Sequence, residues 1–230
     1  MRSFCTGLGY NPESSETMVT KSREKKESMN RVIYEEKSVA PSKVVCVGRN
    51  YVEHIEELGN EMPDNMVLFN KPNSAITDRL CTFGPETRFE GELCFLVGGG
   101  ELAGVGFGLD LTHADIQNRL KAKGLPWERA KSFDGAAVLS PFVSFAGAVE
   151  DLHFTLLRNG EIAQEASTSL MIYKPAKILE EIQSFMSLED GDIIMTGTPK
   201  GVSTYEKGDR FEATVYEGEK ELLRVSWIAE

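Results

Sequence analysis

The sequence lacks the features that mark membrane, secreted and zinc-finger proteins. Its 230 residues contain four cysteines, with no CxxC pair and no zinc-finger spacing, so we interpret them as reduced thiols of a cytoplasmic protein. No apolar run approaches the ~18 residues that a membrane-spanning helix needs, and no signal-peptide pattern follows the N-terminus. We therefore expect no membrane partner.

Positive charge is also scarce. The 25 lysines and arginines face 36 acidic residues, which gives a net charge of −11. A field of that sign repels phosphate backbones, so we expect no nucleic-acid partner. A small anionic substrate remains compatible with it, because a local cation or a bound metal inverts the field inside one cleft.

Two regions of different composition divide the chain. Residues 1–28 are rich in Ser, Thr, Glu and Lys, and they lack the apolar positions needed to bury a face. This predicts a disordered or flexible extension over 1–28. The regular apolar runs of residues 29–230 predict a single domain.

Short β-rich runs indicate an α+β fold in which strands dominate. We predict strands at 43–47, 92–97, 142–145, 154–157, 192–195, 211–215 and 222–225, and helical spacing at 51–58, 114–123 and 175–185. Because few ten-residue helices lie between the strands, we expect mixed or antiparallel sheets and not a doubly wound parallel one.

Three acidic residues lie in apolar surroundings. Glu90 and Glu92 are two positions apart, so on a strand they point to the same face, and Asp110 lies between two leucines. Most Glu-x-Glu pairs on strands simply lie on a solvent-exposed face. If all three converge, however, they repel one another unless a cation or a proton intervenes. Oxygen donors without a nearby His or Cys suit Mg²⁺ or Mn²⁺ first and Ca²⁺ second.

Two further patterns suggest chemistry. On a helix His54 and Glu57 are side by side at i and i+3, which is either an ordinary surface pair or a base oriented by a carboxylate. Lys131 is either a solvated cation or a pocket cation that offsets an anionic substrate. The turn at 196–201 can present hydroxyls and backbone N–H groups to a carboxylate.

In combination these residues resemble the fumarylacetoacetate hydrolase family, in particular its small acylpyruvate hydrolase and oxaloacetate decarboxylase members. The resemblance runs from about residue 43 to the C-terminus. Its motifs are VCVGRNY at 45–51, LFNKP at 68–72, EGE at 90–92, LDLT at 109–112, GLPW at 124–127, AKSF at 130–133 and TGTPKG at 196–201. Each motif alone is weak, but their order and number are specific.

The resemblance implies a mixed β-sheet roll and a homodimer with one catalytic domain. It also implies roles for individual residues. The metal ligands are Glu90, Glu92 and Asp110, the catalytic residues are His54, Glu57 and Lys131, and the substrate-binding residues are Arg49, Tyr51, Gln117 and Thr198.

Three departures from the family pattern stand out. Ala114 replaces a frequent arginine, so a bidentate partner for a substrate carboxylate is lost, and Arg119 or Arg49 are candidates to compensate. Phe89 replaces a frequent histidine before the first metal glutamate. The connection between Glu92 and Asp110 is short.

The leading functional hypothesis is metal-dependent C–C bond hydrolysis of an acylpyruvate or related β-diketo acid through a stabilised enolate. Oxaloacetate-type decarboxylation or isomerisation of a hydroxydienoate shares that enolate, so the fold cannot separate these reactions. From another class, a non-catalytic, metal-stabilised protein that binds small carboxylates is the alternative. Catalysis that depends on both His54 and Glu57 would distinguish the enzyme from this alternative.

Overall fold

Strands dominate the computed structural model, which describes residues 29–53 and 65–230. In these ranges the largest sheet has seven strands, in the order β4 (Val67–Pro72), β3 (Lys43–Gly48), β13 (Ile193–Met195), β7 (Gly91–Gly98), β8 (Glu101–Asp110), β10 (Ala137–Leu139) and β5 (Ile76–Thr77). The pairs β13–β3 and β10–β5 are parallel and the others are antiparallel. The prediction of a mixed sheet is confirmed.

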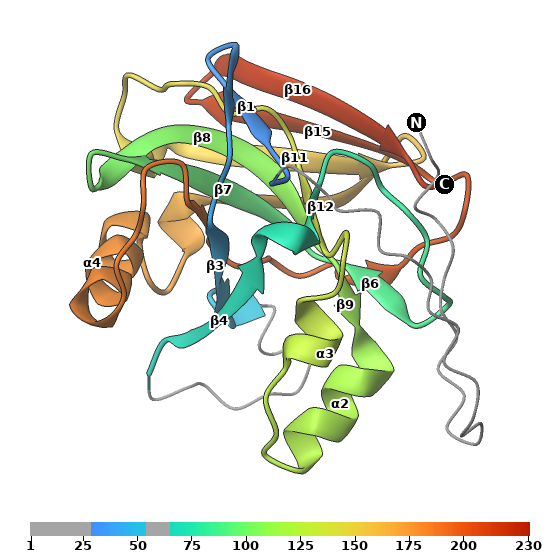
Figure 1. Cartoon of the computed structure of the whole chain (residues 1–230). Coiled ribbons are helices and arrows are strands. Elements are labelled where there is room, and N and C mark those ends of the chain that lie inside the picture. The colour runs from blue at the N-terminus through green and yellow to red at the C-terminus, as the bar shows by residue number, and fades with distance from the viewer. Residues whose placement is uncertain (1–28, 54–64) are drawn as a thin grey trace.

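Further strands of the described part form three smaller sheets. One is antiparallel and contains β12 (Glu161–Ser167), β11 (Leu152–Arg158), β15 (Arg210–Glu217) and β16 (Lys220–Ile228). The others contain β14 (Ser203–Thr204), β6 (Thr87–Phe89) and β9 (Thr112–His113), and β1 (Val32–Tyr34) with β2 (Lys37–Val39). In Figure 1 the four-stranded sheet lies across the top of the view, with β7 and β8 beneath it.

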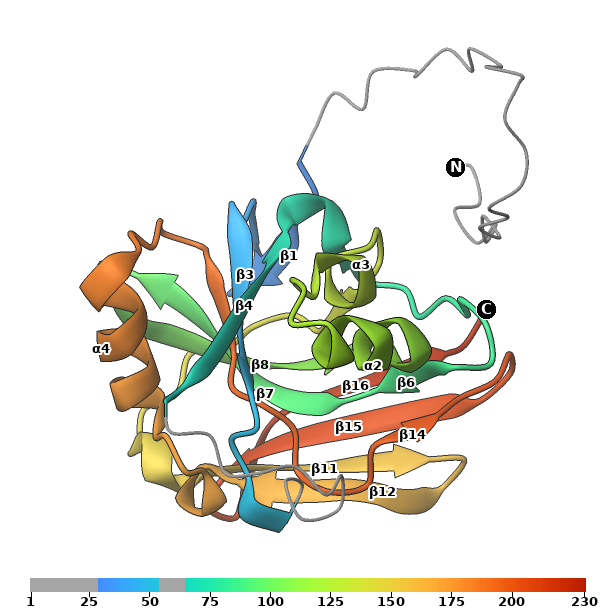
Figure 2. The same cartoon turned by 90° about the horizontal axis from the view of Figure 1, so that it is seen from below.

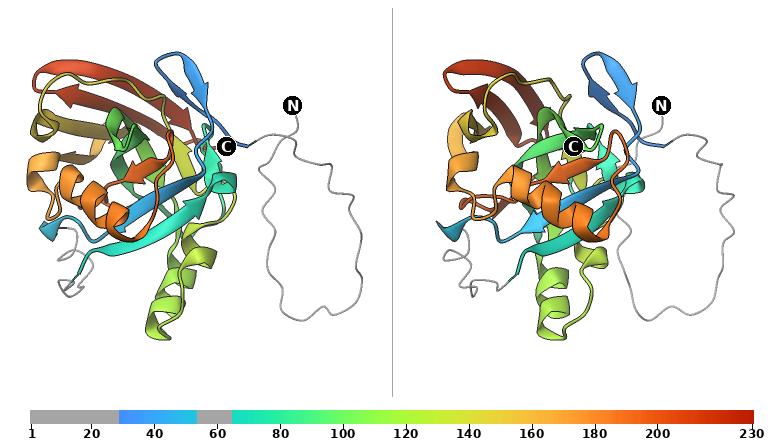
Figure 3. Two further views of the ribbon diagram at one scale, coloured as in Figure 1. Left: turned by 60° about the vertical axis from the view of Figure 1, so that its left-hand side comes forward. Right: turned by 90° about the vertical axis from the view of Figure 1, so that its left-hand side faces the viewer.

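The helices lie on different sides of the sheets. They are α2 (Ala114–Ala122), α3 (Glu128–Lys131) and α4 (Pro175–Phe185), with 3-10 turns at Asn73–Ala75, Val149–Asp151 and Thr168–Leu170. Figure 2 shows α2 and α3 near β6, away from α4, and in Figure 3 α2 projects at the bottom of both views. No helix in the described ranges is long and apolar enough to cross a membrane.

Both faces of β7 are buried, which explains its nearly continuous apolar sequence. Leu93 and Phe95 point into the core shared with the four-stranded sheet, whereas Cys94 and Leu96 point to the opposite core. Helix α4 begins with a proline at a position where the missing N–H costs nothing, and it buries Ile178 among the valines of the largest sheet. The acid-bearing strands are therefore held rigidly from two sides.

Two local predictions differ from the structure. Residues 142–145 form no regular strand. Phe142 makes an isolated parallel bridge to Tyr34 of β1 and Val143 an isolated antiparallel bridge to Val105 of β8, so the run changes partner from one residue to the next and extends neither ladder. Cys46 and Cys94 are free and buried, but Cys81 is disulfide-bonded, so the prediction of a reduced thiol is wrong there.

Candidate metal centre and active site

The hairpin of β7 and β8 brings the three predicted acids together. Glu90 and Glu92 share a face by strand alternation, and the Asp110 amide donates to the Glu90 carbonyl across the hairpin at 2.8 Å. One carboxylate oxygen from each lies within 4.8 Å of the others. Glu92 and Asp110 are each only 1% exposed. The three predicted acids therefore lie together, with Glu92 and Asp110 buried and Glu90 partly exposed.

Two lysines surround Asp110. The Lys131 ammonium lies 2.7 Å from Asp110 Oδ2, 2.9 Å from Glu90 Oε2 and 2.6 Å from Thr112 Oγ1. Lys71 Nζ forms an ion pair with Asp110 Oδ1 at 2.8 Å and donates to the Lys131 carbonyl. Both lysines are buried, so Lys131 is not a solvated cation. Three carboxylates thus face two ammonium groups.

Burial and charge shift the pKa values of this cluster. Burial raises the pKa of Glu92 well above its usual value, and the charges of Asp110 and Glu90 add to the rise. Burial acts to lower the pKa of Lys131, but the charges of Asp110 and Glu90 outweigh it and raise the pKa. A raised carboxyl pKa means that the cluster gains free energy from any added cation.

The residues fit a divalent cation. Their donor atoms are all carboxylate oxygens, which suit Mg²⁺ and Mn²⁺. Asp110 Oδ1 is buried and accepts no hydrogen bond within the described part of the chain, although Lys71 lies at ion-pair distance. Glu92 is oriented by the Gly197 amide, which donates to its Oε2 at 2.7 Å. Such hydrogen bonds fix a ligand before the metal arrives.

The predicted substrate-binding residues have different environments. Arg49 is half-buried after β3 with φ of 60°, and Gln117 is half-buried on α2. The Tyr51 side chain is buried, and its hydroxyl has no hydrogen-bond partner among the described residues. Burial raises the Tyr51 pKa, with a further rise from Glu92. The Thr198 hydroxyl is already engaged, since it donates to the Gly91 carbonyl at 3.0 Å.

The catalytic pair predicted at His54 and Glu57 lies outside the described residues. Just before it, the buried Asn50 amide donates to the Thr196 carbonyl at 2.8 Å, and its Oδ1 accepts from the Tyr173 amide at 2.7 Å. Asn50 therefore ties the chain just after β3 to the turn that orients Glu92.

The structure also locates the departures from the family pattern. Arg119 pairs with Asp115 at 3.2 Å on the outer face of α2, and its side chain is 71% exposed, so it does not replace an arginine at Ala114. Phe89 is a core residue, edge-on to Phe211 with ring centroids 4.9 Å apart. Its replacement of a histidine therefore adds to packing.

Sequence reasoning missed several residues around the acids. Lys71 and Thr112 contact the cluster directly, Gln164 accepts from the Gly91 amide between the two glutamates, and Asn50 donates to the Thr196 carbonyl in the turn beside Glu92. A usable signal existed for Lys71, because a lysine inside an apolar strand is rarely buried without a charged partner. Nothing local to Gln164 indicated its partners.

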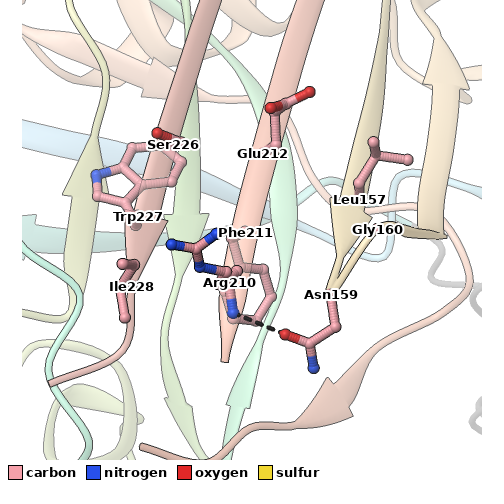
Figure 4. Close-up of a pocket in the computed structure, with 9 residues that line it drawn as sticks. All are labelled: Leu157, Asn159, Gly160, Arg210, Phe211, Glu212, Ser226, Trp227 and Ile228. Atoms are coloured by element: carbon pink, nitrogen blue, oxygen red, sulfur yellow. Dashed lines mark hydrogen bonds between the residues drawn. The ribbon is translucent and has the colours of Figure 1, made fainter. Parts of the chain in front are cut away.

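A cavity of about 660 Å³ lies elsewhere, on the four-stranded sheet (Figure 4). Strands β11, β15 and β16 line it, and none of the predicted site residues does. The hydrogen bond drawn in the figure runs from the Arg210 amide to Asn159 Oδ1, in the turn between β11 and β12. We therefore assign the candidate site to the acid cluster and not to this cavity.

The fold and the cluster together define a strand-rich protein with a largely buried cluster of carboxylate oxygens whose chemistry fits a divalent cation. Residues 43–223 match the profile described as Fumarylacetoacetate (FAA) hydrolase C-terminal. The chain therefore belongs to the fumarylacetoacetate hydrolase family, and the resemblance inferred from its motifs is confirmed.

Two relatives and one solved structure show which members of the family the chain is similar to. The chain is 37% identical over 203 residues to Oxaloacetate tautomerase YcgM of Escherichia coli (strain K12), which covers 80% of this chain and 92% of that protein. It is 36% identical to Oxaloacetate tautomerase FAHD1, mitochondrial, of Bos taurus, in an alignment that covers 75% of this chain and 86% of that protein. Fumarylpyruvate hydrolase from Pseudomonas aeruginosa, solved in complex with Mn²⁺ and pyruvate, aligns with a TM-score of 0.79 at 27% identity, covering 88% and 96%.

Proposed function

We propose that this protein is a metal-dependent enzyme that interconverts the keto and enol forms of oxaloacetate or a similar 2-keto acid. The observation that carries the proposal is the buried cluster of three carboxylates with the Lys131 ammonium 2.7 Å from Asp110. Tautomerisation passes through an enolate, and positive charge in a buried site stabilises an enolate strongly. The relatives named oxaloacetate tautomerases support the same reaction.

Glu90, Glu92 and Asp110 would hold the metal, with Mg²⁺ or Mn²⁺ as the proposed ion. When bound, a divalent ion supplies positive charge that stabilises the enolate oxygen. The ammonium of Lys131 would donate a hydrogen bond to an oxygen of the substrate. Because Lys131 bridges Glu90 and Asp110 in the structure, it would exchange these partners for the substrate.

Tautomerisation breaks one C–H bond beside the keto group and forms one O–H bond on the keto oxygen. We propose that His54 takes the proton from carbon, with Glu57 setting its orientation, as their spacing predicts. Arg49, Tyr51, Gln117 and Thr198 remain the proposed substrate contacts. The unpartnered Tyr51 hydroxyl supports its part, since a substrate oxygen would satisfy it.

A second candidate is the C–C bond hydrolysis of an acylpyruvate that the sequence favoured. It is supported by the likeness to the hydrolase whose structure contains Mn²⁺ and pyruvate. In this reaction the proposed His54–Glu57 pair would remove a proton from an attacking water. Both reactions need the same enolate stabilisation. Tautomerisation only moves a proton from carbon to oxygen, whereas the hydrolysis also consumes a water, whose oxygen bonds to the acyl carbon as the C–C bond breaks.

The purified protein should be assayed with enol oxaloacetate, and in parallel with keto oxaloacetate and acetylpyruvate, in Mg²⁺, Mn²⁺ or EDTA. Metal-dependent loss of the enol without pyruvate release supports the tautomerase. Pyruvate from acetylpyruvate alone selects the hydrolase, and pyruvate from oxaloacetate alone selects a decarboxylase. Metal binding without any turnover would favour the non-catalytic carboxylate-binding protein.

Two further expectations stay predictions. The homodimer is to be tested by the mass of the protein in solution. The cytoplasmic location is to be tested by cell fractionation, since the bovine relative is named mitochondrial.

A further inference from the structure

A buried glutamine of the four-stranded sheet reaches into the acid cluster's backbone. Gln164 lies on β12 and is 2% exposed. Its Oε1 accepts from the Gly91 amide at 2.8 Å. Its Nε2 donates to Thr198 Oγ1 at 2.9 Å and to the carbonyls of Pro199 and Lys200 at 3.2 and 3.3 Å. Every polar atom of this amide therefore has a partner of the matching kind.

These bonds close a ring. The Thr198 hydroxyl, which accepts from Gln164, donates in turn to the Gly91 carbonyl at 3.0 Å. Gly91 thus has both its amide and its carbonyl bound by the same pair of side chains. The ring joins three segments that are far apart in sequence: the start of β7, the middle of β12 and the turn after β13.

The ring lies directly against the proposed metal ligands. Gly91 lies between Glu90 and Glu92, so the peptide units on its two sides determine the backbone positions from which the two glutamate side chains extend. At its other corner, Gly197 precedes Thr198 and donates its amide to Glu92 Oε2 at 2.7 Å. A shift of the ring would therefore move the two glutamates relative to each other and to Gly197.

The packing around the ring is too tight for a side chain at its glycines. A Cβ atom on Gly91 would lie 2.8 Å from Gln164 Oε1 and 2.9 Å from Phe107 Cζ, closer than real Cβ contacts allow. Gly201, with φ of 97°, is likewise closed against the backbone of Ala163. A side chain at position 91 would therefore displace the glutamine amide or the Phe107 ring.

We propose that Gln164 is a positioning residue for the metal site: through Gly91 and Thr198 it holds Glu90, Glu92 and the Gly197 amide in the arrangement that binds the ion. This inference rests on the metal site of the proposed function. Gln164 does not contact the ion or the substrate, and it acts on affinity through the ligands. Partners that orient metal ligands typically change metal affinity 10–100-fold when they are removed.

The test compares Gln164→Met, which keeps the side-chain length but loses all four hydrogen bonds, with wild type. Gln183→Met on α4 is the matched control, because its amide also bonds a backbone carbonyl, that of Gly100 at 2.8 Å, but far from the acids. The affinity for Mn²⁺ is measured by electron paramagnetic resonance, and urea denaturation in EDTA gives stability. We expect Gln164→Met to bind Mn²⁺ at least tenfold more weakly while folded, and Gln183→Met to match wild type.

The outcomes separate the two proposals. If wild type binds no Mn²⁺, the proposed metal site itself is wrong. If wild type binds and folded Gln164→Met binds within twofold of it, Gln164 only stabilises the fold and the positioning role is refuted. Should Gln164→Met not fold, Thr198→Val opens the ring at its other corner with little change in shape. An approximately tenfold loss of Mn²⁺ affinity then supports the role, and an unchanged affinity overturns it.

Discussion

Replacing Glu92 by glutamine should stabilise the metal-free protein while weakening its binding of metal. Glu92 is buried beside Asp110 and Glu90, with donor oxygens within 4.8 Å. At that distance and an effective dielectric of 20, one pair of carboxylates repels by about 3.5 kcal/mol. Proton uptake caps the penalty: an ordinary carboxyl with a pKa of 4.5 takes up a proton at pH 7 for about 3 kcal/mol.

Other contacts of Glu92 reduce the stability that Glu92→Gln is expected to add. The charge of Lys131 favours the ionised form of Glu92, and glutamine keeps an oxygen for the Gly197 amide. We therefore expect Glu92→Gln to raise the free energy of unfolding at pH 7 in EDTA by about 1–3 kcal/mol, or several degrees in Tm. Loss of one charged ligand should lower the affinity for Mn²⁺ in the same variant.

The gain should depend on pH with a defined sign. Because burial raises the folded-state pKa of Glu92 above the unfolded value of 4.5, the folded protein binds this proton more tightly. The penalty is therefore absent below about pH 4.5 and grows as the pH rises toward the folded pKa. Urea denaturation at pH 5 and pH 7.5 measures it, with exposed Glu101→Gln as the control. A Glu92→Gln variant that is less stable than wild type in EDTA at pH 7.5 would refute the reasoning.

Three further predictions test separate parts of the account. Lys131→Met should lower kcat about 10²–10³-fold, as measured by steady-state kinetics, yet still bind Mn²⁺; an unchanged kcat would remove it from the mechanism. His54→Ala should lower kcat about 10²–10⁴-fold without changing Mn²⁺ affinity, and near-normal turnover would contradict its role as the base. Burial acts to raise the pKa of Asp192, but hydrogen bonds from Lys43, Glu189 and Ser42 outweigh it and lower the pKa. Asp192→Asn should therefore lower the free energy of unfolding by about 1–3 kcal/mol at pH 7. That difference should persist above the unfolded pKa of 3.8 and disappear as the pH falls through the lower folded pKa, and equal urea midpoints at pH 7 would contradict it.

Local patterns were sufficient to predict the elements that local physics determines. The spacing at 175–185 matches α4 (Pro175–Phe185), because a proline at its first turn and apolar residues on one face fix both its start and its orientation. The alternation of Glu90 and Glu92 likewise predicted a shared face. By contrast, the run at 142–145 has strand composition but pairs only through single bridges to β1 and β8, and composition alone carries no information on the extent of pairing.

The remaining site residues depend on contacts between distant segments. Lys71 on β4 and Lys131 on α3 meet at Asp110 because these two elements pack together. Gln164 meets Gly91 because two sheets face each other across a shared core. Such contacts follow from topology, which strand propensities do not encode. The motifs of the family pointed to Lys131 and to the three acids that the structure brings together, but these supporting residues required the structure.

The central claim is that the acid cluster binds the metal on which enolate chemistry depends. It is tested most directly by stripping the protein with EDTA, adding Mn²⁺ in steps, and measuring bound Mn²⁺ and the rate of oxaloacetate tautomerisation in the same samples. The account predicts a rate proportional to occupancy of one site per chain, with both lost in Asp110→Asn. A full rate in the stripped protein, or one that does not change with occupancy, would contradict it.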